Sequence, residues 1–181
     1  MNKKIKILLY SSNLWMFGYG LLGPLFAVFA ERLGGSILDI SWAWAIYLIV
    51  AGILTIILGK FSDGNLSKKK LMLLGYILNT IFTFSYLFVS SPLHLLLVQI
   101  GIGVAYAMAE PTWDALYTRY QDKKQRGYEW GLAVGGSQIV SGIAVVLGGF
   151  IVIYFSFKAL FIIMGIVQLI ATLYQAQILK K

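Results

Sequence analysis

The 181-residue sequence contains no cysteine and a single histidine, His94. The missing cysteines exclude disulfides, thiolate nucleophiles and cysteine-bound zinc or iron–sulfur clusters, and one imidazole argues against a histidine-rich metal site. No phosphate-binding glycine loop and no pairing of a nucleophile with a base is recognisable. We therefore expect neither an enzyme nor a bound cofactor or metal, and ATP-driven work would require another subunit.

Charged residues are also scarce, at 12%, whereas hydrophobic residues make up 59%. An ordinary soluble domain has about 25% charged and roughly 45–50% apolar residues. The apolar residues form long stretches, and the short segments between them hold most of the charges. This pattern is typical of helices embedded in lipid, so the sequence predicts an all-α membrane protein.

A membrane-spanning helix needs about 20 mostly apolar residues. The segments that meet this requirement are 7–30, 39–59, 71–90, 93–116, 130–153 and 157–178. The connections between them are too short to fold separately. We therefore predict that residues 1–181 form a single domain of six transmembrane helices.

The net charge of +8 is distributed unevenly over the connections. Only Arg32 and Lys158 fall on one side of the predicted membrane; the other thirteen basic residues share the opposite side. Because basic loops stay in the cytosol, both termini are predicted to be cytosolic, in the cytoplasmic membrane. The charge thus indicates orientation rather than nucleic-acid binding. A signal peptide ending at Ala27-Val28-Phe29-Ala30 is an alternative for residues 1–30, although the apolar stretch is long for one.

Glycine is abundant where helices are expected to pack closely in lipid. Segment 130–153 is the richest, and Gly131 and Gly135 form a small-xxx-small pair; ordinary packing and a functional hinge are both open interpretations. Segments 7–30 and 93–116 each carry a Gly-x-Gly followed by a proline, Pro24 or Pro111. Such weak internal repetition is consistent with a three-plus-three inverted repeat.

Residues 59–70, which read GKFSDGNLSKKK, resemble the signature between the second and third helices of the major facilitator superfamily. Gly59 and Asp63 match in identity and spacing, whereas Gly64 and Leu66 depart from the usual pattern of Arg and Gly. Segments 19–26 and 111–131 resemble other parts of the same family more loosely. The resemblance covers essentially the whole chain.

This resemblance implies a transporter fold of twelve helices in two six-helix halves, of which the chain supplies one. A parallel homodimer, a separately encoded second half or truncation of a longer chain would each explain this. The implied function is secondary active or facilitative transport of small molecules by alternating access. The alternative is a membrane scaffold or assembly protein that kept the fold without a pathway.

The resemblance also suggests a cytosolic latch around Asp63. In a dimer, Asp63 would dock near residues 127–131 of the partner. The residues expected to take part are Gly59, Asp63, Lys68, Lys69, Lys70, Arg119 and Glu129, with the lysines facing Glu129 and Arg119 holding Asp63. The alternative is a solvated loop whose basic residues only set orientation.

Glu110 lies within a predicted span, and Asp114 follows four residues later on the same helical face. An intramembrane carboxylate normally faces water or a partner. We therefore expect Glu110 to bind a proton or a cationic substrate; the alternative is that both acids pair with Arg119 at the headgroups. Further candidates for a central cavity, which the family lines with its first and fourth helices, are Asn13, Trp15, Phe17, Gln99, Tyr106 and Gln138.

Overall fold

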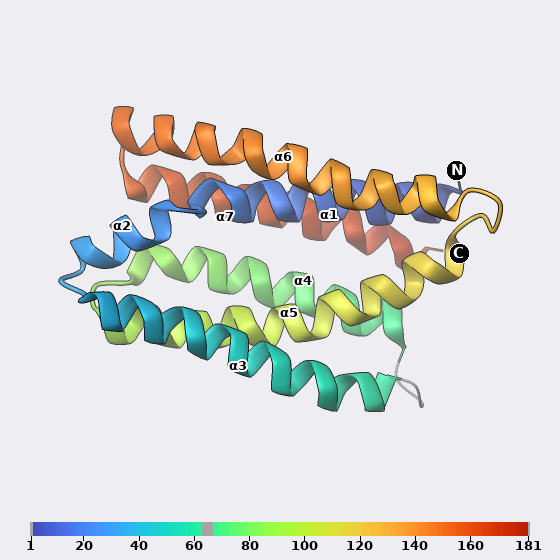
Figure 1. Ribbon diagram of the computed structural model, residues 1–181, viewed down its shortest axis with the longest axis horizontal. Coiled ribbons are helices and arrows are strands. Elements are labelled where there is room, and N and C mark those ends of the chain that lie inside the picture. Colours follow the sequence, from blue (N-terminus) through green and yellow to red (C-terminus); the bar gives the residue numbers. More distant parts are fainter. Residues whose placement is uncertain (1, 63–66, 181) are drawn as a thin grey trace.

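The computed structural model describes residues 2–62 and 67–180, and this part of the chain is almost entirely helical. The helices are α1 (Lys3–Leu22), α2 (Leu25–Arg32), α3 (Ile37–Ser62), α4 (Lys68–Ser85), α5 (Pro92–Tyr120), α6 (Arg126–Tyr154) and α7 (Phe157–Gln175), with short 3₁₀ turns at Tyr86–Phe88 and Ala176–Leu179 (Figure 1). Several of them reach beyond the predicted segments. The all-α membrane fold predicted from the sequence is confirmed.

The prediction of one continuous helix over residues 7–30 is wrong, because α1 and α2 meet at an angle of 48°. Gly23 adopts φ +24° and ψ −121°, a backbone conformation outside the helix that glycine tolerates. Pro24 follows and has no N–H to continue the helical hydrogen bonds. Within the described residues, five helices are long and apolar enough to cross a membrane, and the bent pair gives a sixth candidate span.

The helices pack as two groups of three. α1 contacts α6 and α7, and α5 contacts α3 and α4 in the same manner, while α4 and α7 join the two groups. α1 and α5 touch each other only sparsely, and α3 and α6 lie at the two edges of the arrangement. Both chain ends lie at the same end of the bundle as the α5–α6 connection (Figure 1).

Close backbone approach and interhelical hydrogen bonds hold the bundle together. Gly148 of α6 lies so near Leu21 of α1 that a Cβ there would overlap the Leu21 carbonyl oxygen. Thr80 of α4 and Thr172 of α7 share a hydrogen bond of 2.8 Å, and the Ser11 hydroxyl of α1 donates to Gln175 at the end of α7. Such contacts replace the hydrophobic driving force that lipid removes.

Candidate functional site

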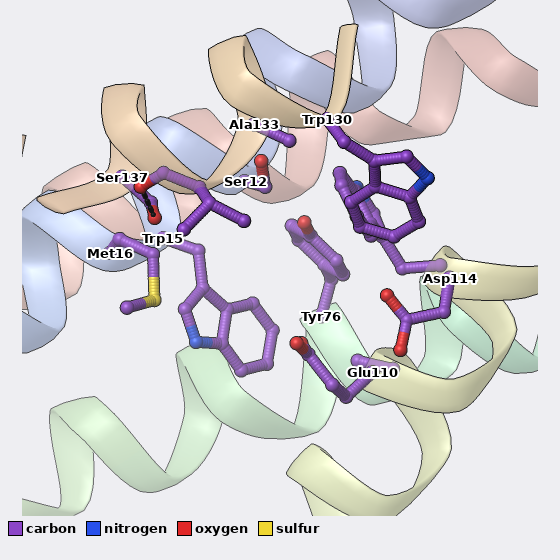
Figure 2. Close-up of a pocket in the computed structure, with 12 residues that line it drawn as sticks. Ser12, Trp15, Met16, Tyr76, Glu110, Asp114, Trp130, Ala133 and Ser137 are labelled. Atoms are coloured by element: carbon purple, nitrogen blue, oxygen red, sulfur yellow. Dashed lines mark hydrogen bonds between the residues drawn. The ribbon is translucent and has the colours of Figure 1, made fainter. Parts of the chain in front are cut away.

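A cavity of about 140 Å³ opens between the two groups of helices. Its walls come from α1, α4, α5 and α6, and its lining includes Ser12, Tyr76 and Ser137 near the midpoints of their helices. Figure 2 shows these residues around the space, with Glu110 and Asp114 on one side of it. The lining residues of α5 and α6, however, lie in the halves of these helices nearer the α5–α6 connection. The cavity therefore lies between the middle of the bundle and the end that holds this connection.

Glu110 and Asp114 reach the cavity because they lie one helical turn apart on α5. Both side chains are solvent-exposed, and within residues 2–62 and 67–180 no lysine, arginine or histidine lines the cavity. The site is therefore acidic. A carboxylate in such surroundings is suited to binding a proton or a cationic group.

Four aromatic side chains, Trp15, Tyr76, Trp113 and Trp130, form part of the remaining wall. Trp15 meets Tyr76 edge-on with ring centroids 4.5 Å apart, and Trp113 lies 6.2 Å from Trp130. The Trp113 indole is fixed further, since its N–H donates to the Leu8 carbonyl at 3.1 Å. These faces could hold a cation through their π-systems as well as pack against apolar groups.

Of the cavity residues predicted from sequence, Glu110 and Trp15 line this space, and the others do not. Asn13 faces Gly136 of α6, and its Oδ1 is buried without a hydrogen-bond partner among the described residues. Phe17 packs against the hydrophobic core, and Gln138 of α6 is exposed outside the cavity.

The two remaining predicted cavity residues lie elsewhere on α5. Tyr106 is half-buried with its ring 6.1 Å from that of Tyr47. Gln99 is buried and lines a second cavity near the α1–α2 bend.

Sequence reasoning did not single out several residues that line the Glu110 cavity, namely Ser12, Tyr76, Trp113, Trp130 and Ser137. Trp113 and Trp130 lie in segment 111–131, which resembles the family, and this resemblance was the sequence signal that could have identified them. Tyr76 carried none, because it lies on the third span, α4, whereas the family resemblance assigns the cavity to the first and fourth helices.

The predicted latch residues gather at the end of the bundle that holds the termini. Asp63 lies outside the described residues. Lys68, Lys69 and Lys70 form the first turn of α4, Gly59 lies near the end of α3, and Arg119 is exposed in the last turn of α5.

Glu129 differs from the other predicted latch residues because it is buried, with 2% of its surface exposed. Its carboxylate accepts a hydrogen bond of 3.1 Å from the backbone N–H of Asp122, and its carbonyl accepts one of 2.6 Å from the Tyr117 hydroxyl. Glu129 thus fastens the α5–α6 connection within its own subunit.

Comparison with known protein families identifies the family to which the chain belongs. The family model described as Major Facilitator Superfamily matches residues 8–179. The chain belongs to the Major Facilitator Superfamily. The resemblance predicted from residues 59–70 is confirmed, and membership identifies a multi-pass membrane protein of a transporter family.

Two members of the superfamily are similar along most of the chain. An uncharacterized MFS-type transporter of Methanocaldococcus jannaschii is 24% identical over 173 residues, which cover 96% of this chain and 45% of that protein. The uncharacterized MFS-type transporter YitZ of Bacillus subtilis is 21% identical over 145 residues, covering 80% of this chain and 88% of YitZ. The chain therefore spans less than half of the archaeal relative but most of the length of YitZ.

Proposed function

We propose that this protein moves small molecules across the cytoplasmic membrane by alternating access, as a secondary active or facilitative transporter. The observation that carries the proposal is the cavity between the two groups of helices, which is lined by two carboxylates, Glu110 and Asp114. A scaffold needs no such space, and a sealed, apolar core would have favoured that alternative. In this proposal Glu110 takes up and releases a proton, or holds a cationic group of the substrate, as the cavity changes sides.

We propose further that two copies assemble side by side through α3 and α6. These edge helices are the least buried of the five long spans. In the most apolar 18 residues of each span, the buried share is 17% in α3 and 11% in α6, against 39–50% in α4, α5 and α7. A second subunit with the same orientation would cover both edges at once. A two-fold axis between the copies would place α3 of each against α6 of the other.

Glycines on α6 support this assembly. A Cβ added at Gly127, Gly131, Gly135, Gly142 or Gly149 would meet no atom within 4 Å. Their spacing places all five on one face of the helix, beside the face that packs on α1. Lipid gains nothing from a groove of small residues, whereas a partner helix gains close contact.

The order of helix packing supports a three-plus-three repeat. α1, in the first span, packs against α6 and α7, which are the fifth and sixth spans. α5, the fourth span, packs in the same way against α3 and α4, which are the second and third spans. The first three spans and the last three therefore have corresponding neighbours. Inverted repeats of this kind place the substrate at mid-depth between moving units. In the dimer the two Glu110 cavities would face each other and form one central site.

The latch remains part of the proposal in a narrower form. Asp63 of one subunit would dock at the start of the partner's α6, near Gly127 and Gly131, with Lys69 and Lys70 nearby. Because Glu129 is held inside its own subunit, its role would be to fix that helix start rather than to meet the partner's lysines.

The proposal is tested by measuring particle mass and flux on the full chain. The subunit mass is 20.1 kDa, and in a mild detergent the protein component of the particle should weigh twice this value. Proteoliposomes loaded with a pH-sensitive dye are then challenged with a library of small cations and neutral solutes. We expect a subset to move protons or to accumulate with the wild type but not with Glu110→Gln. A monomeric particle without flux would contradict the homodimeric transporter.

A further inference from the structure

The charge of the Glu110 cavity limits the class of molecule that it can bind. Glu110 and Asp114 supply two carboxylates, and none of the lining residues in the described part of the chain is basic. In Figure 2 both carboxyl groups point into the space between Trp15 and Trp130. Because opposite charges attract strongly where little water separates them, this space favours a cation over an anion or a neutral molecule.

The lining offers few oxygen atoms for a bare metal ion. Apart from the two carboxylates, its side-chain oxygens are the hydroxyls of Ser12, Tyr76 and Ser137. The two serine hydroxyls already donate to the carbonyls of Leu9 and Val134 within their own helices. Hard cations such as Ca²⁺ and Mg²⁺ prefer about six or more oxygen ligands at fixed distances. The donor set is therefore better suited to an organic cation.

The size of the cavity indicates how large the bound cationic group is. Its volume of about 140 Å³ is close to that of the roughly 150 Å³ cavity known to accommodate a benzene ring. An ammonium group that carries several methyl groups has a similar size. A bare ammonium group would leave most of this space unfilled.

The aromatic walls distinguish between kinds of ammonium group. The rings of Trp15 and Tyr76 meet at 67°, and those of Trp113 and Trp130 meet at 69°. Trp113 is held in place by stacking on Tyr117, with ring centroids 4.5 Å apart. Rings set at such angles form corners, and aromatic corners attract quaternary ammonium groups through their π-electrons. A primary ammonium group is more strongly hydrated, so it loses more on entering such a space.

We propose that the Glu110 cavity recognises a small quaternary ammonium group. This inference rests on the proposed function, because it names the substrate class of the same site. The carboxylates of Glu110 and Asp114 oppose the positive charge, and the tryptophan and tyrosine rings contact the methyl groups. Recognition therefore requires the charge and the methyl groups together.

Choline is a suitable probe because its nitrogen is positively charged and carries methyl groups. Its binding to the detergent-purified full chain is measured by isothermal titration and by ligand-observed NMR. The alcohol 3,3-dimethyl-1-butanol has the same shape with carbon in place of the charged nitrogen, and ethanolamine keeps the charge without the methyl groups. We expect saturable binding of choline and binding of both analogues that is weaker by about tenfold or more.

Substitutions then assign the recognition to the lining residues. Glu110→Gln and Asp114→Asn should each weaken the binding of choline but not that of 3,3-dimethyl-1-butanol. Trp15→Leu should weaken choline binding about 3-fold to 30-fold, the range of one cation–π contact, whereas Trp15→Phe should retain most of the affinity. Trp44→Leu is the control, because Trp44 is a partly exposed tryptophan of α3 that does not line this cavity.

Three results would overturn the proposal. No saturable binding of choline, or equal binding of choline and its neutral analogue, would show that the cavity does not recognise the charge. Ethanolamine bound as tightly as choline would show that the aromatic rings contribute nothing. If the variants do not fold, this comparison of ligands on the wild type decides by itself.

The same protein in proteoliposomes separates this proposal from the proposed function. Choline binding without flux of any solute would support the ligand class and contradict transport. Flux of other solutes without choline binding would support transport and overturn the ligand class.

Discussion

Replacing Gly135 of α6 by leucine should dissociate the proposed dimer without unfolding the subunit. A Cβ at Gly135 meets no atom within 4 Å, so a side chain can leave the backbone there without a clash in the isolated subunit. In the dimer it would enter the contact between α6 and the partner's α3. Overpacking of a close contact typically costs about 1–3 kcal/mol.

The two-fold symmetry doubles this effect, because each dimer contains the substituted contact twice. The expected loss is about 2–6 kcal/mol, which corresponds to a dissociation constant raised roughly 30-fold to 10⁴-fold. Analytical ultracentrifugation over a range of protein-to-detergent ratios measures that constant.

The matched control adds bulk to a surface outside the proposed interface. Ile170 of α7 is 48% exposed, and Ile170→Phe should leave the dissociation constant unchanged. The melting temperature of the monomeric fraction should be the same in both variants and the wild type. A Gly135→Leu protein that dimerises as tightly as the wild type would refute the assignment of the glycine face to the interface.

Three further outcomes follow from contacts within the subunit. Gly148→Ala should lower the free energy of unfolding by about 1–3 kcal/mol, because the added Cβ overlaps the Leu21 carbonyl. Gly149→Ala, at the next residue but in open space, should change that free energy little. Equal effects of the two substitutions would contradict the packing of α6 on α1. Ser11→Ala should destabilise the fold by about 1–3 kcal/mol in thermal unfolding, because it removes the hydrogen bond to the Gln175 side-chain oxygen. Ser85→Ala serves as the control, because the Ser85 hydroxyl bonds only within its own helix. Glu110→Gln should abolish the pH dependence of any flux, because glutamine cannot exchange a proton. Substitution of the exposed Glu31 in Glu31→Gln should preserve that dependence. A pH profile unaltered by Glu110→Gln would exclude the proton role.

The sequence predicted the fold class and the family, and it singled out Glu110 as a site residue, because each depends on a strong local signal. Long apolar segments identify spans whatever their packing, and a carboxylate such as Glu110 within a span has few structural uses. The sidedness of the chain rests on loop charges and stays a prediction.

What the sequence could not predict depends on how the helices are rotated in the bundle. Gly148 and Gly149 are adjacent and chemically identical, yet one packs against Leu21 and the other faces open space. Tyr76 reaches the Glu110 cavity only because α4 packs beside α5. Glu129 resembled a surface acid, and its burial depends on the path of the α5–α6 connection.

The central claim, that the Glu110 cavity opens to each side of the membrane in turn, is tested most directly by cysteine accessibility. The chain contains no cysteine, so Ser137→Cys introduces a single thiol into the lining of the cavity. A membrane-impermeant thiol reagent is applied to right-side-out and to inside-out vesicles. We predict modification from both sides, with rates that shift in opposite directions when Glu110→Gln is added. Modification from one side only, or from neither, would contradict alternating access.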